Sequence, residues 1–293
     1  MNKIYLRNQT LKIFILVLMT IIFFAVWVCL FSNFKTKTKI DANKHSGLVL
    51  PILMYHGITK NKEHENRFFI NFKLFEKDLE FLKKHGFNTI FVSDLINFMN
   101  GNQSLPEKPI ILTFDDGYLN NYLYVFPLIK KYNFKIILSP IGKCLDKYST
   151  VHDRNPDTAC VTWEDIKEMA DSGLVEIQNH TYDMHSKKKR YGCKILKDEH
   201  IIEYEEKLAK DLTKFQESME IHGIAPPNTF TYPFGAICEE CEEIIKKLGF
   251  KASFSCYGKM NFIKSPSDSY SLGRFLRPNN ISPENFFRKN KIN

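Results

Sequence analysis

Apolar residues change their spacing along the chain, and the changes predict alternating strands and helices. Short, nearly continuous apolar runs at 47–56, 109–114 and 134–142 are typical of strands buried in a parallel sheet. Between the first two runs, residues 73–86 place apolar side chains three and four positions apart, the spacing of a helix that buries one face. Gly86 stands where such a helix commonly ends.

The same alternation continues to the end of the chain. The further predicted strands are 87–92, 174–180, 229–235 and 251–258, and the further predicted helices are 93–100, 124–133, 162–173, 203–223, 241–249 and 282–290. Repeated strand and helix favour an α/β fold, either a parallel barrel or a doubly wound sheet. In both folds functional side chains gather at the carboxyl ends of the strands.

The amino-terminal part of the chain has a different character. Residues 13–31 carry no charge, and at about 1.5 Å per residue a helix of this length just crosses the apolar core of a bilayer. The run ends in bulky residues without a small-residue cleavage pattern, which favours an uncleaved signal anchor over a removed signal peptide. By analogy with export signals, residues 1–12 are expected in the cytoplasm. Residues 32–47 are polar and predict a linker, so the folded domain is expected at 48–293, outside the cell.

Composition and charge narrow the function classes. With 44% hydrophobic residues the chain has enough apolar side chains for one sizeable domain. The formal net charge of +8 is spread as lysine, which is typical of a solvated surface, and no basic and aromatic motif predicts nucleic-acid binding. Outside a membrane this charge would favour anionic wall polymers. No feature indicates an obligate protein partner.

Seven cysteines are present, one of them in the predicted anchor. Their spacing fixes no disulfide pairing, and free thiols or mixed states are expected. The pair Cys238 and Cys241 opens a predicted helix, and without a second such pair it does not indicate a zinc ribbon.

Two adjacent aspartates follow the strand at 109–114. Asp115 and Asp116 repel each other, so the pair is most easily kept where a cation binds one carboxylate and leaves the other free as a base. Asp and Gly are also ordinary turn residues, and a tight turn is the alternative interpretation of this stretch.

Histidines follow other predicted strands at the same expected edge of the sheet. His56 ends the first strand, and His180 and His185 flank Asp183 on a later strand-end loop. On a helix, a spacing of five would separate the two histidines by about 140°, so a helical zinc motif is excluded and they are expected to converge from a loop. A carboxylate with two imidazoles makes a three-ligand face suited to zinc or another divalent ion. A structural hydrogen bond is the alternative role for each histidine.

In this order, the stretches TFDDG at 113–117, HTYDMH at 180–185 and YPFG at 232–235 resemble the polysaccharide deacetylases of carbohydrate esterase family 4. The resemblance runs from residue 50 to about residue 275. It implies a distorted (β/α) barrel with fewer than eight repeats. It also implies an enzyme that removes N-acetyl groups from amino sugars in peptidoglycan, poly-N-acetylglucosamine or related polymers.

The resemblance implies roles for individual residues. Asp115 corresponds to the catalytic base, and Asp116 with His180 and His185 to the ligands of a divalent metal, which is expected to be zinc. The backbone N–H of Phe234 corresponds to a donor for the tetrahedral oxyanion. The residues expected to contact substrate or product acetate are Thr181, Tyr232 and Pro233.

Two positions depart from the family pattern. Thr231 stands where the family has an arginine two residues before the motif proline, and no histidine follows His222, so the family's late Leu-x-His acid is absent. We therefore predict His56 as the general acid, and Arg274 is a candidate for the missing charge. The same departures leave open a membrane-anchored glycan-binding relative that has lost its chemistry. A metal phosphoesterase would need carboxylates for two ions, and the sequence offers one triad.

Overall fold

The computed structural model describes residue 19, residues 39–40 and residues 47–292. Apart from Met19, the predicted membrane segment at 13–31 lies outside the described residues, as do residues 1–12 and most of the predicted linker. Within the described part, no helix combines the length and the apolar character needed to cross a bilayer.

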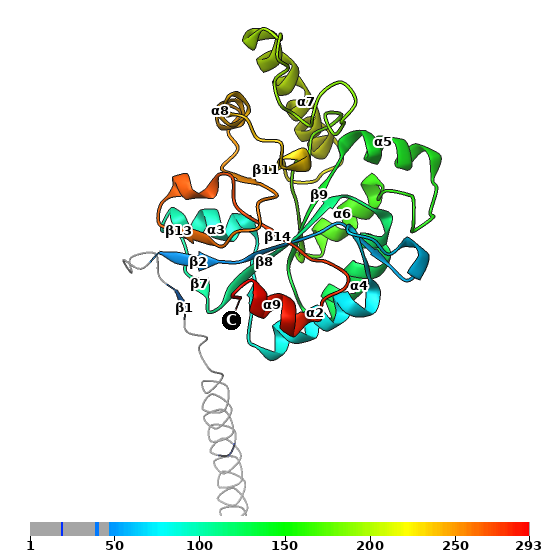
Figure 1. Ribbon diagram of the computed structural model, residues 1–293, viewed down its shortest axis with the longest axis vertical. Coiled ribbons are helices and arrows are strands. Elements are labelled where there is room, and N and C mark those ends of the chain that lie inside the picture. Colours follow the sequence, from blue (N-terminus) through cyan, green and yellow to red (C-terminus); the bar gives the residue numbers. More distant parts are fainter. Residues whose placement is uncertain (1–18, 20–38, 41–46, 293) are drawn as a thin grey trace, which may run out of the picture. The chain divides into compact units, whose positions relative to one another are not determined.

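Parallel strands form the centre of the domain (Figure 1). They are β3 (Ile52–Tyr55), β6 (Asn88–Thr89), β8 (Pro109–Asp116), β9 (Ile136–Pro140), β10 (Val175–Ile177), β11 (Thr229–Thr231), β12 (Ala252–Phe254) and β14 (Phe275–Leu276). In the main sheet the order is β10–β9–β8–β3–β14, every pairing is parallel, and β6 pairs with the start of β8. The predicted parallel α/β sheet is therefore confirmed.

The sheet continues into a ring. β11 and β12 pair in parallel. A single bridge joins Asn179, after β10, to Phe230 in β11, and another joins Phe254 in β12 to Leu272, just before β14. Parallel pairing thus passes around seven of the described strands and returns to β14. This arrangement agrees with the expected barrel of fewer than eight repeats.

Helices pack around this ring. They are α2 (Phe72–Lys84), α3 (Val92–Met99), α4 (Phe126–Tyr132), α5 (Gly142–Val151), α6 (Trp163–Asp171), α7 (Ile201–Ile221), α8 (Glu239–Lys247) and α9 (Pro283–Lys289). Of these, α3 contributes Val92, Leu95 and Phe98 to the apolar cluster of the ring's interior. Every helix predicted between residues 47 and 292 is present, whereas the helix predicted at 13–31 lies outside the described residues. The pattern did not predict α5, because that helix buries only Gly142 and Leu145 and so carries almost no apolar period.

Some predicted strands differ from the observed ones. Pro51 divides the predicted strand at 47–56, and its first part, β2 (Leu48–Leu50), pairs antiparallel with β13 (Asn261–Ile263) instead of joining the main sheet. The predicted strand at 87–92 is reduced to β6, because Val92 already belongs to α3.

The cysteines of the described domain are not bridged: they are Cys144, Cys160, Cys193, Cys238, Cys241 and Cys256. Free thiols were among the expected states. Cys241 lies buried in α8, with its Sγ 3.4 Å from the Sγ of Cys193.

Alternation along β8 sets the direction of the functional side chains. Leu112 and Phe114 are fully buried in the large apolar cluster that lies beneath the outer helices. Ile111 belongs to a separate cluster. Because successive side chains of a strand point to opposite faces, Thr113 and Asp115 share the face of Ile111, which is the interior of the ring.

Candidate active site

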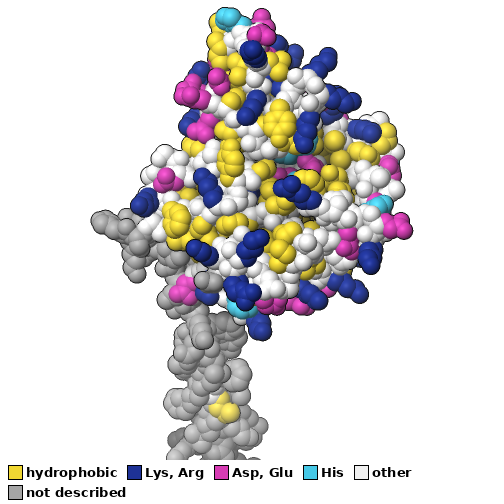
Figure 2. Space-filling model, in the orientation of Figure 1, with side chains coloured by type: hydrophobic (Ala, Val, Ile, Leu, Met, Phe, Trp, Pro, Cys, Tyr) yellow, Lys and Arg dark blue, Asp and Glu magenta, His cyan; other side chains and the backbone are white. Residues whose placement is uncertain are grey.

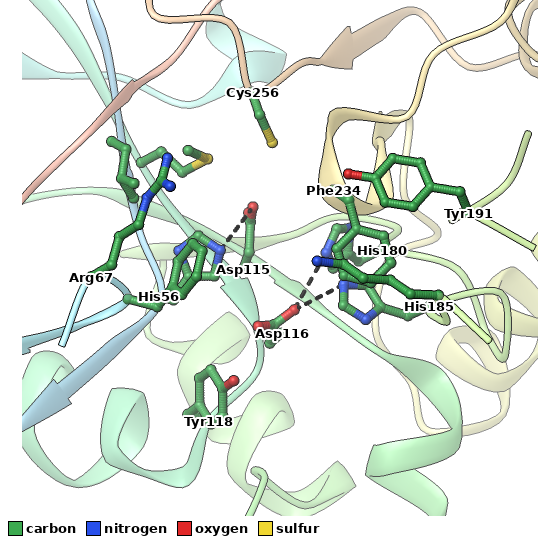
Figure 3. Close-up of a pocket in the computed structure, with 14 residues that line it drawn as sticks. His56, Arg67, Asp115, Asp116, Tyr118, His180, His185, Tyr191, Phe234 and Cys256 are labelled. Atoms are coloured by element: carbon green, nitrogen blue, oxygen red, sulfur yellow. Dashed lines mark ion pairs between the residues drawn. The ribbon is translucent and has the colours of Figure 1, made fainter. Parts of the chain in front are cut away.

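A pocket of about 450 Å³ opens where the strands of the ring end (Figure 3). Strands β3, β8 and β14 contribute to its lining, as do the segments that follow β10 and β12. The predicted site residues that line it are His56, Asp115, Asp116, His180, His185 and Phe234. The rule that parallel strands present functional residues at their carboxyl ends is therefore followed here.

Asp116, His180 and His185 converge on one point of this pocket (Figure 3). Oδ1 of Asp116 lies 3.5 Å from Nε2 of His180 and 3.3 Å from Nε2 of His185. The three ligand atoms all lie within 4.8 Å of one another. Oδ1 of Asp116 is buried and makes no hydrogen bond to another described residue, which is unusual for a carboxylate oxygen. One oxygen and two imidazole nitrogens in this arrangement fit a divalent cation.

Backbone geometry separates the two adjacent aspartates. Asp116 has a φ of 69°, and Gly117 follows with a φ of 74°. A Cβ at position 117 would lie 2.6 Å from Cβ of Pro140, so the turn after β8 requires glycine there. The left-handed turn directs Asp116 toward the histidines while Asp115 keeps the direction of the strand.

Hydrogen bonding and burial prepare the two histidines as ligands. Nδ1 of His180 lies 2.8 Å from the carbonyl oxygen of Thr231, which leaves Nε2 facing Asp116. The ring of His185 packs on the ring of Phe234 at a centroid distance of 4.3 Å. Burial lowers the pKa of His185 to about 4, and so favours the neutral imidazole that binds a metal.

A buried arginine holds Asp115. Nη1 of Arg274 donates to Oδ1 of Asp115 at 2.7 Å, and Nη2 donates to Oδ2 at 2.8 Å. Arg274 is fixed by further bonds to the carbonyl oxygen of Ser255 and to Oγ1 of Thr113, at 2.8 and 3.0 Å. Burial opposes ionisation of Asp115, but Arg274 together with the nearby histidines outweighs it, and the pKa of this carboxyl is lowered. Arg274 thus provides a positive charge at Asp115, and Thr231 instead shares a hydrogen bond with Ser139.

His56 lies on the other side of Asp115 from the triad (Figure 3). Its Nε2 is 4.0 Å from Oδ2 of Asp115, and its ring packs against Phe68 at a centroid distance of 4.8 Å. Nδ1 of His56 is buried and makes no hydrogen bond within the described chain, so the alternative of a structural hydrogen bond finds no partner there. Burial lowers the pKa of His56, and the neutral imidazole is therefore favoured.

The three predicted substrate contacts lie outside the pocket lining. Tyr232 is fully buried in the cluster beneath α7 and α8, and Thr181 and Pro233 are buried as well. The tight turn at 233–235 presents Phe234 to the pocket at a φ of 58°, while Tyr232 and Pro233 beside it are buried. The contacts of all three residues with substrate or product acetate stay a prediction.

Asp183, which the histidines flank in the sequence, is not part of the metal-ligand cluster. Its carboxylate lies on the surface and accepts a hydrogen bond from Nζ of Lys143 at 2.6 Å. The carboxylate of the three-ligand face is that of Asp116, from a strand that lies 64 residues earlier than His180.

Several pocket residues were not predicted from the sequence: Arg67, Phe68, Lys187, Tyr191 and Cys256. Most of them lie on loops, where no apolar period marks a position. The adjacent aromatic residues Phe68 and Phe69, which are partly exposed, were the feature of the sequence that could have indicated this wall of the pocket.

Comparison with known proteins gives a consistent set of matches. The family model described as polysaccharide deacetylase matches residues 102–253. The poly-beta-1,6-N-acetyl-D-glucosamine N-deacetylase of Escherichia coli K12 is 24% identical over 261 residues, which are 83% of this chain and 38% of that protein. The enzyme of the same name from Staphylococcus aureus MRSA252 is 25% identical over 222 residues, 74% of this chain and 70% of the relative. This chain thus spans less than half of the length of the E. coli relative.

Solved structures show the same fold. A de-N-acetylase from Aggregatibacter actinomycetemcomitans matches with a TM-score of 0.69 and 27% identity, over 82% of this chain and all of that one. The Streptococcus pyogenes deacetylase PplD, in complex with acetate, matches with a TM-score of 0.67 and 21% identity, over 83% of this chain and 98% of that one. The second likeness bears on the fold alone.

Proposed function

The chain belongs to the polysaccharide deacetylase family, and on that premise we propose that it hydrolyses the N-acetyl groups of N-acetylglucosamine units in an extracellular or cell-wall polysaccharide. The observation that carries the proposal is the triad Asp116, His180 and His185 beside the Arg274-bound carboxylate of Asp115, all at one pocket. The relatives named poly-beta-1,6-N-acetyl-D-glucosamine N-deacetylase support this substrate class, with peptidoglycan as the other candidate.

The proposed chemistry assigns a task to each polar group. A divalent cation held by Asp116, His180 and His185 would polarise an acetamide carbonyl and lower the pKa of a water molecule, and zinc suits this donor set. Asp115 is ionised beside these ligands, because Arg274 lowers its pKa, and it accepts a proton from the attacking water. Hydrogen bonds from Arg274 to both oxygens fix the direction in which this base points.

His56 is the proposed donor to the leaving nitrogen. It is neutral at rest, because burial lowers its pKa, so the proton that it delivers comes from the water by way of Asp115, 4.0 Å away. The amine then leaves with that proton and acetate retains the water oxygen, which balances the hydrolysis. The Phe234 N–H, in the left-handed turn that faces the pocket, is the proposed donor to the carbonyl oxygen as it becomes negative.

The glycan-binding alternative rested on two departures from the family pattern. The first departure, Thr231 in place of the family's arginine, argues less for lost chemistry, because Arg274 donates to Asp115 instead. Thr231 shares a hydrogen bond with Ser139. The second is addressed only by the proposed role of His56.

Acetate release tests the proposal. The full-length chain in detergent is incubated with N-acetylglucosamine oligomers as purified, after chelation and after return of zinc. We expect turnover that chelation abolishes and zinc restores.

Asp115→Asn and His56→Gln should each reduce turnover by about 10²- to 10⁴-fold. Asp183→Asn is the matched control, since this carboxylate pairs with Lys143 outside the pocket. Metal-loaded protein that binds the oligomers but releases no acetate would support the glycan-binding alternative.

We further propose that the domain acts outside the cell on a single-pass membrane anchor. The uncharged run at 13–31 supports this, because its length suits a bilayer span. Protease treatment of intact cells checks the topology: the domain should be digested while a tag placed before residue 13 survives. A chain released from membranes by alkaline carbonate would contradict the anchor.

A further inference from the structure

Positively charged side chains border the pocket on both sides. Arg67 lies next to His56 on one side, and Phe234 and Tyr191 lie on the other (Figure 3). Nζ of Lys187 lies 4.5 Å from the ring centroid of Phe234 and 5.9 Å from that of Tyr191. Figure 2 shows Lys and Arg side chains around the hollow in which histidine and carboxylate atoms are visible between hydrophobic groups. These two cations come from loops 120 residues apart in the sequence, and the fold brings them to one opening.

Neither cation has a carboxylate partner among the described residues: within residues 47–292, the ion pairs involve neither Arg67 nor Lys187. Each instead lies near an aromatic ring: the guanidinium carbon of Arg67 is 5.6 Å from the centroid of Phe68, and Nζ of Lys187 is 4.5 Å from that of Phe234. Such ring contacts hold a cation close to its place without neutralising it.

The acidic groups of the pocket are neutralised by other charges. Asp115 is paired with Arg274, and a divalent cation on the triad would more than balance Asp116. No other Asp or Glu of the described chain lines the pocket. No acidic group of the pocket is therefore available to neutralise Arg67 and Lys187. Both lie beside aromatic rings of the kind that pack on the faces of sugars.

A neutral polymer of N-acetylated sugars could accept hydrogen bonds from these side chains, but it carries no charge to pair with theirs. A chain that already carries free amines would be repelled by them, because those amines are positive at neutral pH. An anionic group on a sugar next to the reacting one would be attracted, most strongly by the fork of Arg67.

From this geometry we infer that the substrate is an anionic glycan, in which a sugar adjacent to the hydrolysed N-acetyl sugar carries a phosphate or a carboxylate that Arg67 and Lys187 bind. The inference rests on the proposed deacetylase function and narrows its substrate class. The shared chemistry is a fixed negative charge, and the experiment separates its two sources.

Three matched tetramers of N-acetylglucosamine units provide the test: a neutral one, one with a single phosphate monoester, and one with a single uronic acid. For the zinc-loaded full-length chain we expect kcat/KM to be about tenfold higher on the anionic tetramers, a factor that corresponds to about 1.4 kcal/mol. The preference should fall as salt rises from about 0.05 to 0.5 M, because exposed charges are screened.

Variants locate the source of this preference. Arg67→Gln with Lys187→Gln should bring the ratio of anionic to neutral kcat/KM close to one, mainly through KM. Lys188→Gln is the matched control, because this exposed lysine is the next residue along but does not line the pocket. Preference for only one of the two anions would identify the source as phosphate or carboxylate. Equal rates on all three tetramers, or a preference that survives the double variant, would overturn the inference.

Binding separates this inference from the proposed function. Isothermal titration of the zinc-loaded Asp115→Asn variant gives the dissociation constant of each tetramer without turnover. A roughly tenfold tighter complex with an anionic tetramer, lost in the Arg67→Gln and Lys187→Gln background, supports the inference even if the wild-type chain releases no acetate. Acetate release without any such difference in affinity keeps the proposed function and refutes the inference.

Discussion

Replacing Arg274 by methionine should separate the electrostatic role of this residue from its role in packing. Methionine keeps most of the volume of the side chain and removes the charge and five hydrogen bonds, two of them to Asp115. Asp115 is only 2% exposed. Its carboxylate would then be left buried without its cationic partner.

The magnitude follows from the burial of the pair. Removing one member of a buried ion pair costs about 3–5 kcal/mol of unfolding free energy, against about 5–15 kcal/mol for a whole domain. Asp115 now has a pKa below its usual value, so it stabilises the fold above a pH of about 4 and this contribution is lost as the pH falls through the lowered pKa. Without Arg274, only the neighbouring histidines oppose the effect of burial, so the pKa should rise. The destabilisation should therefore be larger at neutral pH than in acid.

Two assays read out the change. Urea unfolding at pH 7 and in acid gives the free energy, and acetate release against pH gives the acid limb of kcat/KM, which should move to higher pH because the base must be ionised. In Asp115→Asn with Arg274→Met, the total destabilisation should be about 1–3 kcal/mol smaller than the sum of the single changes.

Arg277→Met is the matched control. Arg277 is equally buried and holds Asp78 with two hydrogen bonds of 2.8 and 2.9 Å, outside the pocket. It should destabilise by a similar amount and leave the acid limb in place. If the acid limb of Arg274→Met coincides with those of Arg277→Met and the wild type, Arg274 does not tune the base and the reasoning is refuted.

Two other predictions concern the metal ligands and the turn beside them. His185→Ala should weaken zinc binding by at least about 10- to 100-fold, the range seen when only the support of a ligand is lost; stoichiometric zinc by mass spectrometry after dialysis would contradict its role. Gly235→Ala should lower the unfolding free energy by about 2–4 kcal/mol, because Gly235 has a φ of 65° and a Cβ would lie 2.8 Å from Cβ of Cys256. Gly249→Ala, with a φ of 88° but open space, should cost about 1–2 kcal/mol, and equal losses would exclude the contact as the cause.

The sequence predicted the parallel α/β fold because buried strands and one-sided helices leave different apolar periods. The sequence also predicted that polar residues at or after the ends of strands meet at one edge of the sheet. The five residues concerned are His56, Asp115, Asp116, His180 and His185, and all of them line the pocket. The turn at Asp116 was not visible, because it depends on the close approach of Gly117 to Pro140 of the neighbouring strand β9, which no local pattern shows.

Other features depend on contacts that no local pattern encodes. Arg274 reaches Asp115 from 159 residues away, and nothing in the residues around it distinguishes it from Arg277, which reaches Asp78 instead. Tyr232 looked like a sugar-stacking residue by its place in the motif, but the turn at 233–235 buries it. α5 went unpredicted because it lies on the surface with little to bury.

Two of the contacts that close the ring of strands are narrow seams, and residues that follow them, His180 and Cys256, line the pocket. Where β3 meets β8 four residue pairs are in register, whereas one bridge joins Asn179 to Phe230 and one joins Phe254 to Leu272. Segments with fewer shared hydrogen bonds open at lower free energy, so amide hydrogens at these seams should exchange with solvent before those of β8. His180 directly follows the first seam, and Arg274, which holds Asp115, lies two residues after Leu272 and donates to the carbonyl oxygen of Ser255 beside the second. Opening of either seam should therefore reach the chemistry itself: the first would move a metal ligand, and the second would release the base from its arginine.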